Sequence, residues 1–322
     1  MAAGMEFCLL GPLAVRCGGT ALAVPRGKQR AVLAALLLRA NHVVSVDELA
    51  EALWGTDLPP SARVSLQNYV MRLRATLGPA GSRIATHPHG YLIAVGDGEL
   101  DIAQFEALLR EARAAAREGR WPEAASHATA ALALWRGEPL ADAGSDVLAA
   151  REAPRLAEVR LQAAETRIDA DLHLGRHGEV IGELRQLAGT QPLRERLHAL
   201  LMLALYRDSR QAEALAAYRQ ARRVLVEELG TEPGPELQQL HQKILDADPA
   251  LVLTGPPTPA ASAAAPAGPT PRQLPAAVAD FTGRDAELKA LTAMLDQAGT
   301  GAPGTVVISA IGGTAGVGKT IP

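Results

Sequence analysis

Cysteine, aromatic side chains and long apolar runs are all scarce in this 322-residue sequence. Two cysteines, Cys8 and Cys17, exclude a disulfide scaffold and a cysteine-based zinc module, and they fit a reducing cytoplasm. Aromatic residues make up 3% of the chain, which argues against a protein that stacks single-stranded bases. The longest apolar runs, such as Ala31–Leu38, have eight residues, whereas a membrane-spanning helix needs about 20. We therefore expect a cytoplasmic protein without a membrane partner or a secretion signal.

Catalytic and metal-binding patterns are missing as well. The sequence has no HExxH or GxSxG motif, and its eight histidines are scattered rather than spaced as metal ligands. Asp169 and Asp171 fit a solvated helix face better than a catalytic carboxylate pair. We therefore predict that the protein is not an enzyme and has no catalytic residue and no metal site.

The net charge of −3 conceals an uneven distribution. Residues 1–98 carry nine Lys and Arg against six Asp and Glu, whereas residues 99–250 carry 19 against 25. The 39 residues from Leu58 to Gly96 contain no carboxylate. Such a stretch inside an acidic protein indicates an anion-binding face, although a solvated basic surface stays an alternative.

Turn residues and helix-capping residues predict short strands and then two helices before this acid-free stretch. Residues 5–24 are typical of short strands, because their apolar runs are broken by glycine-containing turns. A first helix is predicted from Arg26 to Arg39. A second begins after Ser45, since Ser45 and Glu48 form a capping box ahead of an apolar run.

A third helix is predicted between Ser61 and Leu77, because Pro59-Pro60 precede it and Gly78-Pro79 follow it. At helical spacing one narrow stripe is apolar and should face the core, and it consists of Leu66, Val70, Leu73 and Leu77. The opposite face has no acidic residue and consists of Val64, Asn68, Met71, Arg72 and Ala75, flanked by Ser65, Gln67 and Arg74.

After the third helix, Arg83–Ile93 predicts two strands around a Pro/Gly turn, which is the shape of a wing. The motif RLR at Arg72–Arg74, followed by a hairpin ending in Gly90-Tyr91, resembles the winged-helix effector domain of bacterial response regulators. This resemblance implies that the third helix enters the major groove of double-stranded DNA. The wing would contact the backbone or the adjacent minor groove.

By that resemblance, Asn68 and Arg72 read base edges, since Asn bonds adenine and Arg bonds guanine bidentately. Contacts are not carried over to Tyr69 and Met71, where the family often has polar residues. The remaining expected DNA-binding residues are Ser65 and Gln67 as supporting contacts, Arg74, Arg83 and His87 at phosphates or in the minor groove, and Arg63.

Residues 101–248 show helical periodicity nearly throughout. The segment Gly175–Leu184 aligns with Ser209–Tyr218 at an offset of 34 residues, and Gly119–Ala128 aligns with the first at an offset of 56. A helix-turn-helix unit of 34 residues is the tetratricopeptide period. We therefore predict an all-α repeat array, which leaves a concave surface for a partner.

Four motifs of this array resemble the bacterial transcriptional activation domain, namely DIAQFEALL (Asp101–Leu109), LWRGEPLAD (Leu134–Asp142), RLAEVRLQAAE (Arg155–Glu165) and ELGTEPGPEL (Glu228–Leu237). A winged helix followed by this domain resembles the Streptomyces antibiotic regulatory protein family over about residues 5–250. The resemblance implies an activator of secondary-metabolite (antibiotic) biosynthesis genes. It would bind direct repeats in promoter DNA as a dimer and recruit the RNA polymerase holoenzyme through its sigma factor and core subunits.

The last part of the sequence begins with seven prolines between Pro256 and Pro275, which predicts a disordered linker. GTAGVGKT then satisfies the phosphate-loop pattern and, with Phe281–Leu291, resembles the signal-transduction ATPases fused to larger family members. The expected nucleotide-binding residues are Gly313, Gly316, Gly318, Lys319 and Thr320. Because no second acidic motif follows to hold a metal or a water, we expect neither tight nucleotide binding nor hydrolysis. No cofactor is expected in this form, and ATP and Mg²⁺ would need a complete ATPase domain.

The predicted fold class is therefore mostly α. An α+β winged helix spans residues 1–98, an all-α tetratricopeptide-like domain spans 99–250, a linker spans 251–279, and a truncated piece of a P-loop ATPase domain spans 280–322. Two other functions stay open at this point. One is a nucleotide-switched signalling ATPase regulator, and the other is a repeat scaffold without DNA specificity.

Overall fold

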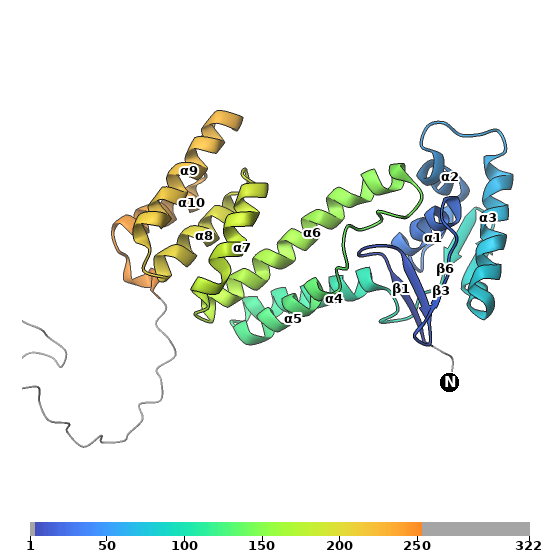
Figure 1. The fold of residues 1–322 in the computed structure, drawn as a ribbon, viewed down its shortest axis with the longest axis horizontal. Coiled ribbons are helices and arrows are strands. Elements are labelled where there is room, and N and C mark those ends of the chain that lie inside the picture. Colours follow the sequence, from blue (N-terminus) through green and yellow to red (C-terminus); the bar gives the residue numbers. More distant parts are fainter. Residues whose placement is uncertain (1–3, 253–322) are drawn as a thin grey trace, which may run out of the picture. The chain divides into compact units, whose positions relative to one another are not determined.

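A computed structural model describes residues 4–252 of the protein (Figure 1). Nearly all of the predicted linker and the whole predicted ATPase piece lie outside the described residues, including the five nucleotide-binding candidates from Gly313 to Thr320. The described residues are mostly helical, with a small β region near the N-terminus. This agrees with the predicted balance of helix and strand.

The chain begins with a three-stranded antiparallel sheet in the order β1-β2-β3. Phe7 pairs with Val15 across the first two strands, and both side chains are buried. Because side chains alternate between the faces of a strand, the neighbouring Glu6 and Arg16 point to the other face and are exposed. The strands are β1 (Met5–Cys8), β2 (Ala14–Cys17) and β3 (Thr20–Leu22).

Two helices follow, and the second starts as its sequence signals predict. In the structure Ser45 Oγ accepts the backbone N–H of Glu48, and the Glu48 carboxylate accepts the backbone N–H of Ser45 at 2.8 Å. This capping box satisfies two of the N–H groups that a helix start leaves without helical partners. The elements here are α1 (Lys28–Leu38), the short strand β4 (Val44–Ser45) and α2 (Val46–Trp54).

The third helix and the hairpin after it complete a winged-helix domain, as predicted. The strands of the hairpin pair antiparallel, with His87 opposite Gly90 at the turn, and β4 joins them to give the sheet order β4-β6-β5. The elements are α3 (Ala62–Leu77), the 3-10 helix η1 (Gly78–Arg83), β5 (Ile84–His87) and β6 (Gly90–Ile93).

Residues 101–251 form a series of helices in which neighbours along the chain pack on each other (Figure 1). The three segments that align in the sequence begin α5, α7 and α9, whose first residues are Trp121, His177 and Gln211. Their spacing therefore reproduces both sequence offsets, and the tetratricopeptide assignment itself stays a prediction. The elements are α4 (Asp101–Arg117), α5 (Trp121–Ala133), α6 (Asp146–His173), α7 (His177–Thr190), α8 (Glu195–Arg207), α9 (Gln211–Leu229), α10 (Pro235–Leu245) and the 3-10 helix η2 (Pro249–Leu251).

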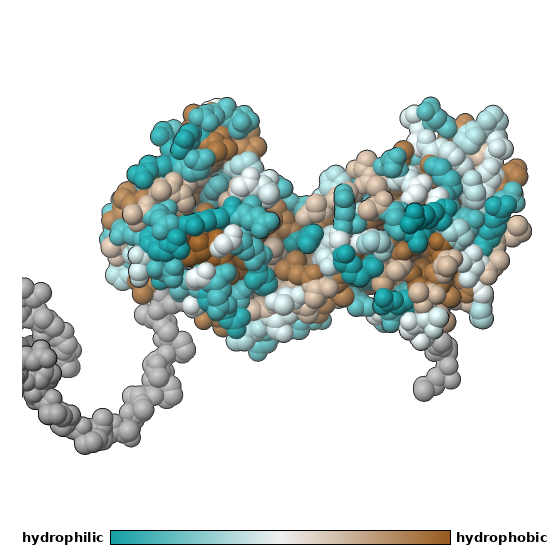
Figure 2. Space-filling model, viewed as in Figure 1, coloured by the Kyte–Doolittle hydropathy of each residue, from teal (hydrophilic) through white to brown (hydrophobic). Residues whose placement is uncertain are grey.

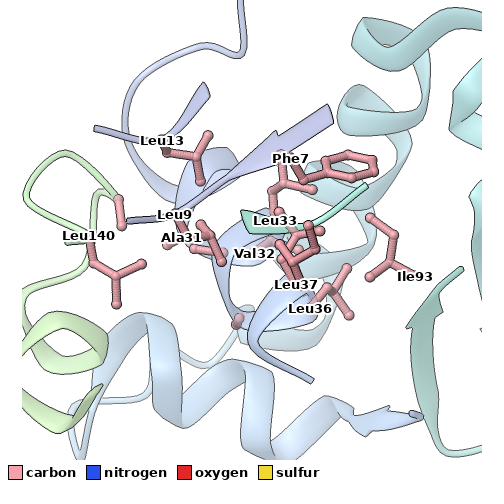
Figure 3. Close-up of a cluster of buried hydrophobic side chains, with 14 of the residues drawn as sticks. Phe7, Leu9, Leu13, Ala31, Val32, Leu33, Leu36, Leu37, Ile93 and Leu140 are labelled. Atoms are coloured by element: carbon pink, nitrogen blue, oxygen red, sulfur yellow. The ribbon is translucent and has the colours of Figure 1, made fainter. Parts of the chain in front are cut away.

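One hydrophobic cluster joins the winged helix to the first helices of the array. Leu140, from the segment between α5 and α6, lies in the same cluster as Leu9 and Ala31 (Figure 3). Phe7 of β1 and Phe105 of α4 are almost fully buried members of this cluster. The two sequence modules therefore share a core and belong to one compact unit.

The buried carboxylate of Asp101, at the start of α4, holds the segment that follows β1. Its oxygens accept the backbone N–H of Leu9 at 2.8 Å and that of Leu10 at 2.9 Å. Burial raises the pKa of Asp101, while these N–H groups and the guanidinium of Arg136 act in the opposite direction. The backbone N–H of Arg136 also donates to the Leu10 carbonyl at 2.7 Å.

A second carboxylate reinforces this junction. Asp142 accepts the backbone N–H of Leu13 at 2.7 Å and forms an ion pair with Arg30 of α1. Nearby, Ser145 Oγ donates to the Ala52 carbonyl at 2.5 Å and caps α6. Polar groups of the array thus satisfy backbone groups of the winged helix that would otherwise be buried without partners.

We predict that Asp101→Ala lowers the free energy of unfolding of the full chain by about 2–5 kcal/mol, because it leaves the N–H groups of Leu9 and Leu10 buried without acceptors. Urea unfolding followed by circular dichroism measures this loss. Asp97→Ala is the matched control, since Asp97 is exposed. Equal stability of the two variants would contradict the assigned role.

Candidate nucleic-acid interface

Helix α3 is fixed by burial of one side. Its stripe residues Leu66, Val70, Leu73 and Leu77 are at most 3% exposed, and the helix packs against α1 and α2. This confirms the predicted core stripe. Tyr69 lies partly buried beside Trp54, with ring centroids 6.4 Å apart. Rotating α3 about its axis would therefore bring apolar side chains into water.

The opposite side of α3 is exposed, as predicted. Its exposed residues are Val64, Asn68, Met71, Arg72 and Ala75, with Gln67 exposed at one edge and Ser65 half-buried at the other. Arg63 is also exposed, but at the start of the helix and beside the buried stripe. Within residues 4–252, neither Arg63 nor Arg72 has a carboxylate partner within ion-pair distance. Their positive charges are therefore available to an anion.

Arg74 connects α3 to the hairpin. Its Nε and Nη2 donate to the carbonyl of Ile84 at 2.9 and 2.6 Å, and Nη2 also donates to Thr86 Oγ1 at 2.8 Å. All three bonds go to neutral acceptors, so the charge of Arg74 is not cancelled. The sequence predicted a phosphate or minor-groove contact for Arg74, and the structure adds a positioning role that the sequence analysis missed.

Arg83, which the sequence predicts to contact phosphates or the minor groove, has a carboxylate partner in the structure. Its guanidinium forms a bidentate ion pair with the Glu99 carboxylate, in which Nη1 donates to Oε2 and Nη2 donates to Oε1 at 3.0 Å. The hydrogen bonds from Arg83 lower the pKa of Glu99, and the pKa of Arg83 is raised in return. Because Glu99 cancels its charge, Arg83 anchors the start of β5 to the segment before α4.

The tip of the wing depends on a close backbone approach at Gly90. A Cβ atom at this position would lie 1.9 Å from the carbonyl oxygen of Val44, where β4 and β6 pair. Only glycine fits there. The exposed His87 stands opposite Gly90 on β5, so the pairing places this candidate at the outer end of the hairpin.

This arrangement matches the requirements of duplex DNA. An α-helix fits the major groove, and the exposed side of α3 combines an amide, no carboxylate, and a guanidinium that forms no ion pair with residues 4–252. In the described part of the chain there is no cluster of side chains suited to a metal ion. Nor does any helix of that part have the length and apolar character needed to cross a membrane.

Two known families match the two modules of the sequence. Residues 24–93 match "Transcriptional regulatory protein, C terminal", and residues 100–245 match "Bacterial transcriptional activator domain". The regulatory protein DnrI of Streptomyces peucetius is 38% identical over 270 residues, which cover 81% of this chain and 99% of DnrI. The chain belongs to the Streptomyces antibiotic regulatory protein family.

Other relatives of this chain are longer. The regulatory protein AfsR of Streptomyces coelicolor is 44% identical over 319 residues, which cover 98% of this chain but 32% of AfsR. The chain thus spans about a third of that relative. A solved structure of Mycobacterium tuberculosis EmbR in complex with a low affinity phosphopeptide superposes with a TM-score of 0.74, at 38% identity, over 77% of this chain and 66% of that one. Both modules of the chain are thus similar to those of transcriptional regulators.

For this regulator we predict that Gly90→Ala lowers the free energy of unfolding by about 1–3 kcal/mol, because the added methyl group collides with the Val44 carbonyl. Gly182→Ala, in the middle of the exposed side of α7, meets no atom within 4 Å and should instead raise stability by about 0.5–1 kcal/mol. Thermal unfolding of the two variants separates these opposite effects. The same sign for both would contradict the assigned contact.

The Arg83–Glu99 pair predicts a pH dependence. Since the folded regulator lowers the pKa of Glu99, the pair stabilises the fold above the unfolded pKa of about 4.3 and loses that effect as pH falls through the folded pKa. Glu99→Gln should therefore cost about 1–2 kcal/mol at pH 7 and progressively less below about pH 4. Urea unfolding at several pH values measures this.

Asp57→Asn is the control for this pH series, because Asp57 is an exposed carboxylate between α2 and α3. It should leave the stability nearly unchanged at both ends of the pH range. A cost of Glu99→Gln that is the same at pH 7 and at pH 3.5 would show that the ion pair with Arg83 is not its source.

Proposed function

We propose that this regulator activates secondary-metabolite (antibiotic) biosynthesis genes by binding promoter DNA through the exposed side of α3. The observation that carries the proposal is the orientation of this helix. Burial of its four apolar residues directs Asn68 and Arg72 outward, and Arg72 has no carboxylate partner among the described residues. The names of its relatives, regulatory proteins of Streptomyces among them, support the same function.

Asn68 and Arg72 lie one helical turn apart, so both side chains reach the same stretch of groove. Arg72 would bond the O6 and N7 acceptors of guanine, and Asn68 would bond N6 and N7 of adenine. Ser65 and Gln67, at the edges of this side, would add contacts to neighbouring bases or phosphates.

The remaining cations would set the position of α3 on the duplex. Arg63 lies at the start of the helix, and His87 lies at the outer end of the wing. Arg74 keeps its charge beside the wing while holding it to α3. Contacts of these groups with phosphate add affinity that does not depend on sequence, and they fix the depth at which Arg72 meets the bases.

Binding to direct repeats would place two copies of the regulator head to tail, about one helical turn apart on one face of the duplex. The acidic helical array would then contact the RNA polymerase holoenzyme, through its sigma factor and core subunits. Support for this step comes from the match of residues 100–245 to a transcriptional activator domain and from the junction that ties α4 to β1. Two copies would lie side by side because the DNA carries two repeats, so the proposal requires no stable dimer in solution.

The test is footprinting of the full chain on genomic promoter fragments, followed by affinity measurements at a series of salt concentrations. Arg72→Ala should lower affinity for the protected repeat about 10- to 100-fold, with a much smaller effect on random DNA. Arg63→Ala should weaken both and reduce the salt slope by about one.

Arg117→Ala serves as the matched control for these variants, because Arg117 is exposed on α4 and lies outside the candidate interface. It should bind both kinds of DNA as the unaltered chain does. If the chain prefers no promoter fragment over random DNA at any salt concentration, the proposed function is wrong.

A further inference from the structure

Two large apolar side chains stand on the DNA-facing side of α3. Val64 and Met71 are each 60% exposed, although nothing in their surroundings forces an apolar residue there. Over α3 the surface is pale with isolated hydrophobic spots rather than uniformly hydrophilic (Figure 2). A single exposed apolar side chain is ordinary, so exposure alone indicates nothing.

The spacing of Val64 and Met71 along α3 places them on the same side of the helix as Asn68. Val64 and Met71 are seven residues apart, which is two helical turns, and Asn68 lies between them on the same side. Both therefore face whatever Asn68 and Arg72 face. No carboxylate occurs from Leu58 to Gly96, so the surface around them is complementary to a polyanion rather than to a basic partner.

In the major groove the edges of the base pairs are mostly hydrogen-bonding atoms, which an apolar side chain would desolvate without compensation. The one apolar group displayed there is the C5-methyl of thymine. An exposed Val or Met that enters the groove is thus favourable beside thymine and unfavourable beside the donor and acceptor atoms of other bases.

We propose that Val64 and Met71 each contact a thymine methyl group, and that two thymines about three base pairs apart are specificity determinants of each repeat. The proposal rests on the proposed function. Seven residues of helix rise about 10 Å, and successive base pairs are about 3.4 Å apart, which gives the expected separation. The adenine read by Asn68 would lie between the two thymines.

Deoxyuridine substitution tests this inference, because it removes only the C5-methyl group from a thymine. Within the repeat protected by the full chain, each thymine is replaced singly and the dissociation constant is measured. Loss of one buried methyl group should raise the dissociation constant about fourfold at two positions about three base pairs apart. Replacement of the other thymines should leave the dissociation constant unchanged. An operator that is bound with full affinity after every such replacement overturns the proposal while leaving the proposed function intact.

Variants assign each thymine to its side chain. Met71→Ala should abolish the sensitivity to deoxyuridine at one position and Val64→Ala at the other, while Leu193→Ala, which truncates an exposed apolar side chain in the helical array, should retain both. Circular dichroism checks that the variants are folded. Because both side chains are exposed, their truncation should leave the fold intact, and a folding defect would be detected in the spectrum as a separate result. Unchanged sensitivity in both variants overturns the assignment. A chain without any preferred promoter contradicts the proposed function and this inference together.

Discussion

The one-sided burial of α3 is the constraint on which the rest of the interface depends. Leu66, Val70, Leu73 and Leu77 fill the space between α3 and its neighbours, and burying each contributes about 1.5–3 kcal/mol. Turning the helix by one residue, or about 100°, would exchange this stripe for polar side chains. The outward direction of Asn68 and Arg72 is therefore a consequence of core packing and needs no contact of its own.

The wing is held to this helix by groups that sequence reasoning assigned to DNA. Arg74 bridges α3 to β5 through a carbonyl and a hydroxyl group, and Arg83, directly before β5, is paired with Glu99. The two arginines differ in what they leave for a ligand. Neutral acceptors leave the charge of Arg74 in place, whereas the carboxylate of Glu99 cancels that of Arg83. The acceptor of each arginine therefore decides how much positive charge that arginine leaves for an anionic ligand.

Signals within one element allowed most of the fold to be predicted. The capping box at Ser45, the glycine and proline limits of α3 and its apolar stripe are all set by neighbours within a few residues, so the sequence displays them directly. The partner of Arg83 lies 16 residues away, just beyond the expected domain boundary at residue 98, and only the folded chain brings it near. The same holds for Asp101, whose backbone donors Leu9 and Leu10 lie more than 90 residues away.

The contact between Asp101 and the segment after β1 also decides whether the two modules of this chain can be separated. Asp101 and Asp142 accept the backbone N–H groups of Leu9, Leu10 and Leu13, and the apolar cluster passes without a break from β1 and α1 into α4. A winged helix cut away at residue 98 would expose the underside of its N-terminal sheet and leave those N–H groups without acceptors. The matched families end and begin between residues 93 and 100, yet the physical unit does not divide there. Because α3 and the helical array share one core, they keep a fixed orientation. Under the proposed function, a protein bound to the array would therefore be positioned by the DNA that α3 reads.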